Sequence, residues 1–206
     1  SQKGNDIDGE AREDQSGHST AISSDGSTIA IGGYKAKDVD GNRTGHVRIY
    51  KWGGSSWNQL GNDIDGEAID DDSGFSVSLS SDGSIVAIGA PRNDENGNNS
   101  GHVRVYKWDG SSWNQLGNDI DGEDSSNEFG WSVSLSSDGS IVAIGAPLNA
   151  GNGYNSGHVR LFQWDGSSWN QYGFDIEGKA VDYLFGTSVS LSSDGTSVAV
   201  GGPGKD

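Results

Sequence analysis

One short segment of this chain occurs four times, and that repetition limits the folds open to it. The heptapeptide GNDIDGE begins at Gly4, Gly61 and Gly117, and the related GFDIEGK begins at Gly173. A period of about 56 residues predicts tandem copies of one supersecondary unit, each packed against the next. We place the repeats at residues 1–60, 61–116, 117–172 and 173–206, the last of them partial.

Each unit is expected to contain four short strands. The first, such as 132–136, alternates serine with apolar residues and should have one buried face. The second, such as 141–144, is apolar throughout and should be covered on both faces. The third and fourth each carry a tryptophan, and the short loop between Trp108 and Trp113 can place the two opposite each other.

An Asp-Gly step separates the first two strands of every unit, as at Asp138 and Gly139, and favours a tight hairpin. No segment has a sustained 3.6-residue pattern, and glycine occupies 34 positions, so helices should be few. Tandem four-stranded units predict an all-β protein, a β-propeller of four-stranded antiparallel blades. A β-solenoid is the rival architecture, although its coils are usually shorter.

The two ends of the chain do not match a closed ring. Residues 1–7 resemble residues 114–120, which form a predicted fourth strand, whereas the last repeat stops after its second strand. We therefore expect a stray outer strand at the N-terminal end and an incomplete propeller. The chain is either part of a propeller of roughly six to eight blades, or it self-associates through its incomplete terminal blades.

The net charge of the chain limits the classes of partner that it can bind. The chain has 30 acidic and 13 basic residues, a net charge of −17, which disfavours nucleic acid and anionic lipid surfaces and leaves cations or neutral partners. An acidic surface can also serve only to keep a repetitive β protein soluble.

No apolar run approaches the roughly 18 residues of a membrane helix, so no membrane insertion is expected. The absence of cysteine excludes disulfides, and the absence of methionine suggests a processed product or a fragment.

Three stretches of the chain share one wording. They read SGFSVSLSSDGSIVAIGAP (73–91), FGWSVSLSSDGSIVAIGAP (129–147) and FGTSVSLSSDGTSVAVGGP (185–203). These resemble the FG-GAP repeat of integrin α-subunit propellers and of related bacterial and algal surface proteins. The resemblance implies a seven-bladed type of propeller at a cell surface or outside the cell, used for adhesion or ligand binding rather than catalysis.

Calcium is the cofactor that the resemblance suggests. In many FG-GAP blades the loop between the first two strands has the form DxDxDGxxD and cradles calcium, but here it has shrunk to Ser-Ser-Asp-Gly. One carboxylate cannot supply the six to eight oxygen ligands of calcium. The remaining candidate is the acidic segment of each heptapeptide, with alternating acidic residues at Asp6, Asp8, Glu10, Asp63, Asp65, Glu67, Asp119, Asp121 and Glu123.

Two observations weaken that metal prediction. The fourth copy places Lys179 where the others have a glutamate, and its ammonium would oppose a cation. The acidic segments would also serve as solvated crossings from one blade to the next. His46, His102 and His158 recur in Gly-His-Val-Arg, but equivalent positions on different blades do not converge on one zinc ion, so we expect them to pack at strand ends.

Residues that differ between repeats are candidates for recognition. Immediately after the Phe-Gly or Ser-Gly step the units carry His18, Phe75, Trp131 and Thr187. If the first strand is innermost, as the resemblance implies, these four lie near the mouth of the central channel. We predict that Trp131 and Phe75 form an apolar platform for a sugar ring or a peptide side chain; the alternative is that Trp131 belongs to the core.

No catalytic constellation is present in the sequence. It has no Gly-x-Ser-x-Gly elbow, no HExxH, no phosphate loop and no cysteine nucleophile, and paired carboxylates are expected in so acidic a chain. The sequence therefore predicts a non-enzymatic extracellular or cell-surface module that binds a glycan or protein partner. The alternatives are a structural repeat protein that assembles into a filament or coat and, third, the propeller domain of a polysaccharide-active enzyme.

Overall fold

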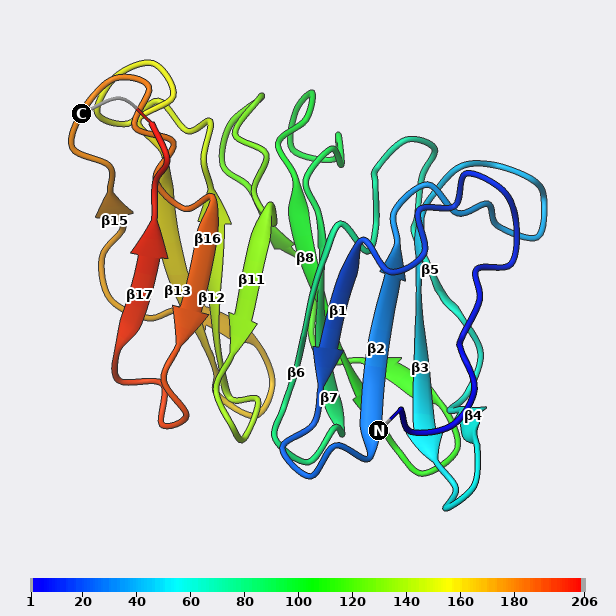
Figure 1. Ribbon diagram of the computed structural model, residues 1–206. Coiled ribbons are helices and arrows are strands. Elements are labelled where there is room, and N and C mark those ends of the chain that lie inside the picture. Colours follow the sequence, from blue (N-terminus) through cyan, green and yellow to red (C-terminus); the bar gives the residue numbers. More distant parts are fainter. Residues whose placement is uncertain (1, 205–206) are drawn as a thin grey trace.

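The computed structural model describes residues 2–204, and its strands form three complete blades followed by the opening hairpin of a fourth (Figure 1). The first blade contains β1 (Ser19–Ile22), β2 (Thr28–Gly33), β3 (His46–Trp52), β4 (Trp57–Gln59) and β5 (Ile64–Asp65). The second contains β6 (Ser76–Leu79), β7 (Ile85–Ala90), β8 (His102–Trp108), β9 (Trp113–Gln115) and β10 (Ile120–Asp121). The third contains β11 (Ser132–Leu135), β12 (Ile141–Ala146), β13 (His158–Trp164), β14 (Trp169–Gln171) and β15 (Ile176–Glu177). The fourth hairpin is β16 (Ser188–Leu191) with β17 (Val198–Gly201).

This architecture confirms the all-β, antiparallel, incomplete propeller expected from the repeats. Within residues 2–204 no helix is found, and so none that is long and apolar enough to cross a membrane. The outer strand of each blade differs from the expectation of one continuous fourth strand, because it is divided into two short pieces. Both pieces pair with the third strand, so that β4 and β5 each lie antiparallel to β3.

The second strand is buried from both sides, as its continuous apolar run predicts. Val86 and Ile88 of β7 pack in a core shared with the first blade, whereas Ile85 and Ala87 pack in a core shared with the third. Full burial of one such aliphatic side chain stabilises the fold by about 1.5–3 kcal/mol. Each blade therefore depends on its neighbours for its core.

The first strands of neighbouring blades, β1, β6, β11 and β16, lie side by side in chain order (Figure 1). They are therefore the innermost strands, on which the blades converge. They are joined through serine side chains. Ser76 Oγ donates to the backbone oxygen of Gly130 over 2.8 Å, and Ser78 Oγ accepts from the backbone N–H of Leu135 over 3.0 Å. The serines of the alternating pattern thus connect blades.

The Asp-Gly steps form the predicted hairpins. Gly139 has φ +70°, and the Asp138 carboxylate accepts hydrogen bonds from Ser136 Oγ (2.7 Å), from the backbone N–H of Ser140 (3.0 Å) and from Ser140 Oγ (2.8 Å). These bonds, led by the one from the Ser140 backbone, lower the pKa of Asp138. The aspartate of each hairpin is therefore a turn former.

The tryptophans face each other in pairs, with ring centroids 5.4 Å apart for Trp108 and Trp113. The second and third pairs also hold the segment between the two outer pieces of the preceding blade. Trp113 Nε1 donates to the backbone oxygen of Leu60 over 2.8 Å, and a Cβ on Gly61 would lie 2.8 Å from the Trp108 ring. Only a glycine lets this segment lie so close to the indole.

The predicted outer strand at residues 1–7 is wrong for its described part, because residues 2–18 contain no strand. A fourth strand needs a third strand as partner, and the described chain has no free third strand beside it. Lys3 and Gly4 instead lie on the first tryptophan pair as Leu60 and Gly61 lie on the second, and the backbone oxygen of Lys3 accepts a 2.9 Å hydrogen bond from Trp57 Nε1.

Candidate functional site

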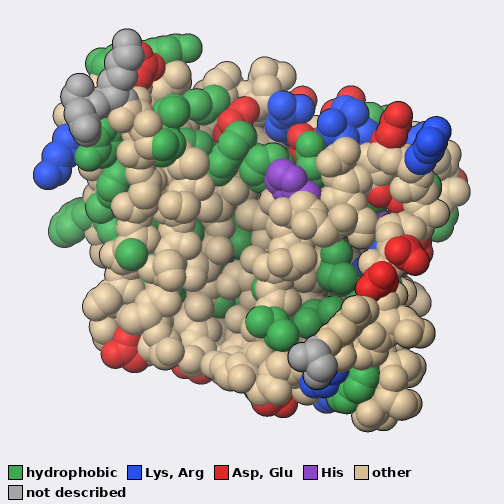
Figure 2. Space-filling view, viewed as in Figure 1, with side chains coloured by type: hydrophobic (Ala, Val, Ile, Leu, Met, Phe, Trp, Pro, Cys, Tyr) green, Lys and Arg blue, Asp and Glu red, His purple; other side chains and the backbone are tan. Residues whose placement is uncertain are grey.

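Four ring side chains form a continuous row where the first strands begin. The rings of Tyr34 and His18 lie 4.5 Å apart, those of His18 and Phe75 4.8 Å, and those of Phe75 and Trp131 4.6 Å. We call these four residues the aromatic row. Figure 2 shows a histidine bordered by hydrophobic side chains near the upper end of this face.

Three of these residues occupy the same position in a repeated turn. The backbone N–H of His18, Phe75 and Trp131 donates in each case to the carbonyl oxygen three residues earlier. The accepting residue has a left-handed backbone in every unit: φ is 56° at Gln15, 57° at Asp72, 52° at Glu128 and 51° at Leu184. Left-handed non-glycine residues are uncommon and occur often at functional sites.

The structure therefore brings together three of the four residues predicted from their variability. Thr187 occupies the same turn, but its hydroxyl donates to the backbone oxygen of Leu184 over 2.7 Å, and its side chain carries no ring that could extend the row. Tyr34 was missed. Its signal in the sequence is that it follows Gly-Gly where the other repeats have the proline of their Gly-Ala-Pro or Gly-Gly-Pro step.

Charged residues border the aromatic row. Asp72 and Glu128 belong to its turns, and Arg92 and Lys35 follow the second strands of their blades. Arg92 Nη1 lies 3.2 Å from the Asp72 carboxylate, which is 3% exposed, whereas the arginine side chain is half exposed. Burial raises the pKa of Asp72 and of Glu128, and Arg92 opposes both shifts. On the other side, the Lys35 ammonium lies 5.3 Å from the Tyr34 ring centre. The row thus has charged groups beside an apolar surface.

A second set of polar residues lies at the outer strands. In each complete blade the histidine that begins the third strand faces the first aspartate of the heptapeptide segment: the Nδ1 to Oδ2 distance is 3.5 Å for His46 and Asp63, 3.3 Å for His102 and Asp119, and 3.8 Å for His158 and Asp175. The three histidines are 1–2% exposed. Burial lowers the pKa of His158 to about 4, although Asp175 opposes this shift.

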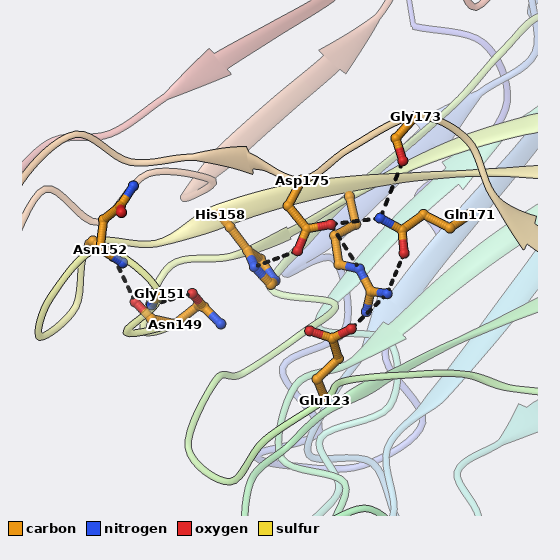
Figure 3. Close-up of polar contacts among 10 residues, drawn as sticks. Glu123, Asn149, Gly151, Asn152, His158, Gln171, Gly173 and Asp175 are labelled. Carbon is orange, nitrogen blue, oxygen red and sulfur yellow. Dashed lines mark hydrogen bonds and ion pairs between the residues drawn. The ribbon is translucent and has the colours of Figure 1, made fainter.

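In each complete blade an arginine of the third strand contacts the glutamate of the heptapeptide segment that precedes that blade. In the third blade Arg160 contacts Glu123 (2.9 Å), Gln171 (2.6 Å) and Asp175 (3.5 Å), as Figure 3 shows. Arg104 contacts Glu67 at 3.2 Å, and Arg48 contacts Glu10 at 3.6 Å. The glutamates of the first three heptapeptide segments therefore reach the blade that follows them.

This arrangement separates the predicted calcium ligands. Within one segment, Asp63 faces the histidine of its own blade, whereas Glu67 contacts the next blade. Asp6 accepts from the Gln2 amide (2.7 Å), and the backbone oxygen of Asp8 accepts from Arg48 (2.8 Å).

Burial raises the pKa of Asp65 and of Asp121, and Glu123 is paired with Arg160. The ligand-type groups that do converge come from different segments. They are Glu10, His46 and Asp63; Glu67, Glu95, His102 and Asp119; and His158, Asp175 and Glu177. Sequence reasoning missed Glu95 and placed the histidines outside any metal site.

Comparison with known proteins agrees with the fold. The FG-GAP repeat family matches residues 63–106 and 119–162, so the chain carries two recognised FG-GAP repeats. No curated protein matches the sequence. The chain is also similar to solved β-propeller structures, at identities that support the fold alone.

One of these structures is described as a 6-phosphogluconolactonase of Bacteroides uniformis, with a TM-score of 0.57 and 14% identity over 89% of this chain and 46% of that one. Another is Sqt1 of Saccharomyces cerevisiae, with a TM-score of 0.54 and 12% identity over 84% of this chain and 39% of that one. The chain thus spans less than half the length of either structure.

Proposed function

We propose that this propeller segment is a non-enzymatic extracellular or cell-surface module that binds a glycan through the aromatic row. The observation that carries the proposal is the unbroken contact of His18, Tyr34, Phe75 and Trp131 across two neighbouring blades and the turn that begins the third. A sugar ring has one apolar face and several hydroxyls. Aromatic rings can cover that face, while charged groups at their edge hold the hydroxyls.

Several features support binding over a purely structural role. The row varies between repeats where the blade frame does not, and its side chains are exposed or half-buried. His18 is exposed although it lies between two rings. A contiguous aromatic surface that stays in contact with solvent is typical of an interaction site, whereas a single exposed ring is not.

The test is a binding screen with the 206-residue chain on an array of neutral and acidic glycans. Trp131→Ala and Phe75→Ala are expected to weaken binding to any retained glycan by about tenfold or more, since an aromatic anchor contributes on the order of 1–3 kcal/mol. Thr187→Ala is the matched control, because it changes the same turn position outside the aromatic row, and it should bind as the wild type does.

Circular dichroism and thermal melting separate the two interpretations of Trp131. Loss of folding in Trp131→Ala would assign this residue to the core, and Trp131→Phe would then test the platform alone. Retention of an apolar peptide instead of any glycan would overturn the glycan assignment, and so would glycan binding that Trp131→Ala and Phe75→Ala leave unchanged.

A structural role in assembly is the second candidate, and the uncovered side of the first blade favours it. Thr20, Ala21, Ile22, Ile29, Ala30 and Ile31 line an apolar hollow of about 330 Å³ there. Ile22 is 62% exposed, whereas Leu79, at the equivalent position of the second blade, packs into the core with the first. A neighbouring blade would cover that surface, whether it belongs to a larger propeller or to a second copy of this chain.

A further inference from the structure

Four ligand-type side chains meet at the outer side of the second blade. They are Glu67 from the crossing after β5, Glu95 from the loop between β7 and β8, His102 at the start of β8, and Asp119 just before β10. One ligand atom from each lies within 4.8 Å of all the others. We propose that these residues, here called the outer quartet, bind one divalent transition-metal ion, with Zn²⁺ as the best match.

His102 provides the observation that an acidic cluster alone would lack. Its side chain is 1% exposed, and its Nδ1 atom is buried without a hydrogen-bond partner, although it lies 3.3 Å from Asp119 Oδ2. A buried polar atom without a partner is uncommon and destabilising. The lone pair of a neutral imidazole is a common metal ligand, so a bound cation would give this nitrogen its missing partner.

The charge of the site also fits a divalent cation. Three carboxylates converge, and the Arg104 guanidinium contacts one of them, that of Glu67, at 3.2 Å. Three negative charges and one positive charge leave an excess of two negative charges. Carboxylates this close repel one another unless a cation lies between them.

The mixture of ligands selects the metal. Calcium and magnesium are bound by oxygen atoms, whereas zinc takes histidine nitrogen together with carboxylate oxygen, usually four ligands in all. In a tetrahedral zinc site with bonds of about 2.1 Å, neighbouring ligand atoms are about 3.4 Å apart. His102 and Asp119 already have nearly this separation. Glu67 and Glu95 are exposed and can approach by rotation of their side chains.

The other blades lack the fourth ligand. In the third blade Gly151 stands where the second has Glu95, and Arg160 contacts Asp175 directly. In the first blade Asp38 stands where the second has Glu95, but its carboxylate accepts hydrogen bonds from Asn42 and does not converge with Glu10, His46 and Asp63. Lys37 also lines that recess. We therefore expect one metal ion for each chain, at the second blade.

The experiment is a calorimetric titration of the metal-free 206-residue chain with zinc chloride, followed by thermal melting with zinc and with a chelator. We expect one bound ion and a zinc-dependent rise in the melting temperature that the chelator removes. Glu95→Gln and His102→Asn should each weaken zinc binding by about tenfold or more. Glu123→Gln is the matched control, because Glu123 is the equivalent of Glu67 one blade later, and it should leave the affinity unchanged.

Several results would overturn the proposal. They are an absence of zinc binding, three equivalent ions for each chain, calcium bound more tightly than zinc, or an unchanged affinity in Glu95→Gln. Circular dichroism verifies that each variant is folded, and anomalous scattering at the zinc edge locates the ion. An ion found away from the outer quartet would also contradict the assignment.

Discussion

Some residues are the same in every repeat because the backbones of neighbouring segments meet there. Gly101, like Gly45 and Gly157, precedes the histidine of the third strand and has φ +77°. A Cβ at Gly101 would overlap the backbone oxygen of Phe129. Neither the backbone conformation nor the space admits another residue, so the invariance of this glycine is explained by packing.

Gly101→Ala is expected to destabilise the fold strongly. The left-handed backbone costs roughly 1–2 kcal/mol for a non-glycine residue, and the overlap with backbone atoms raises the total to about 3 kcal/mol or more. Gly110→Ala is the control, because Gly110 has φ +104° but open space around its Cβ position. Urea unfolding measures both, and equal losses would contradict the role given to the contact with Phe129.

His158 gives the fold a defined dependence on pH. Its pKa lies near 4 in the folded protein and at 6.5 ordinarily, so between these values the unfolded state binds more protons. The stability that the neutral imidazole contributes is complete above about pH 6.5 and is lost as the pH falls toward 4, by about 3 kcal/mol. NMR titration of the imidazole and unfolding of His158→Gln against wild type at each pH check this. Titration near 6.5 would contradict it.

At the scale of the element, the inner strands of adjacent blades share no backbone ladder within residues 2–204. Serine side chains and single backbone bonds, such as that from the Ser81 N–H to the oxygen of Ser137 (2.8 Å), join them instead, so the alternating SVSLS pattern supplies both the apolar face and the links between blades. Leu191 donates its backbone N–H to Ser134 Oγ over 2.9 Å, in the same way that Leu135 donates to Ser78. The strand sequence thus encodes contacts across blades as well as within one.

Ser78→Ala removes the only acceptor described for the Leu135 N–H, and we expect a loss of about 1–2 kcal/mol in the free energy of unfolding. Ser190→Ala changes the equivalent serine of the last hairpin, which is exposed and has no further blade beside it. That variant should lose less than about 0.5 kcal/mol. Chemical denaturation of the two variants provides the comparison, and a neutral Ser78→Ala would show that water replaces the serine.

Most elements could be predicted from the sequence because their signals are local. Period-two alternation, Asp-Gly turns and the tryptophan pairs each lie within one unit. The split outer strand could not be predicted, because it depends on how Leu60 and Gly61 lie against a tryptophan pair of the next blade. The N-terminal segment was misassigned for the same reason, since its likeness to an outer strand says nothing about whether a partner strand is beside it.

At the scale of the whole molecule, neighbouring blades decide which residues meet. The aromatic row was predicted in part because variation between repeats marks it, but Tyr34 comes from a different strand end. The outer quartet was not predicted, because its ligands come from a crossing, a loop and two strand ends that only the packing of two blades brings together. A repeat read by itself contains no signal for such a site.

The uncovered face of the first blade predicts association. The average mass of the 206-residue chain should rise between about 1 and 100 µM when it is measured by light scattering. The double variant Ile22→Ser with Ile31→Ser should abolish that rise. Val39→Ser is the control, since Val39 is 97% exposed but lies on a loop away from that face. A constant mass for the wild type would argue against assembly through this surface.

The contact between each tryptophan pair and the glycine of the heptapeptide segment that precedes its blade limits how such a chain can gain blades during evolution. Equivalent segments contact successive tryptophan pairs in the same way: Lys3 and Gly4 contact the first pair, and Leu60 and Gly61 contact the second. Gly173, the equivalent glycine of the last repeat, has no atom within 4 Å of its Cβ position, so no described tryptophan pair contacts it there. An in-frame duplication of one whole repeat creates only junctions that the molecule already contains. A duplication of any other length would leave one indole pair without its glycine, so selection would admit new blades only in whole copies.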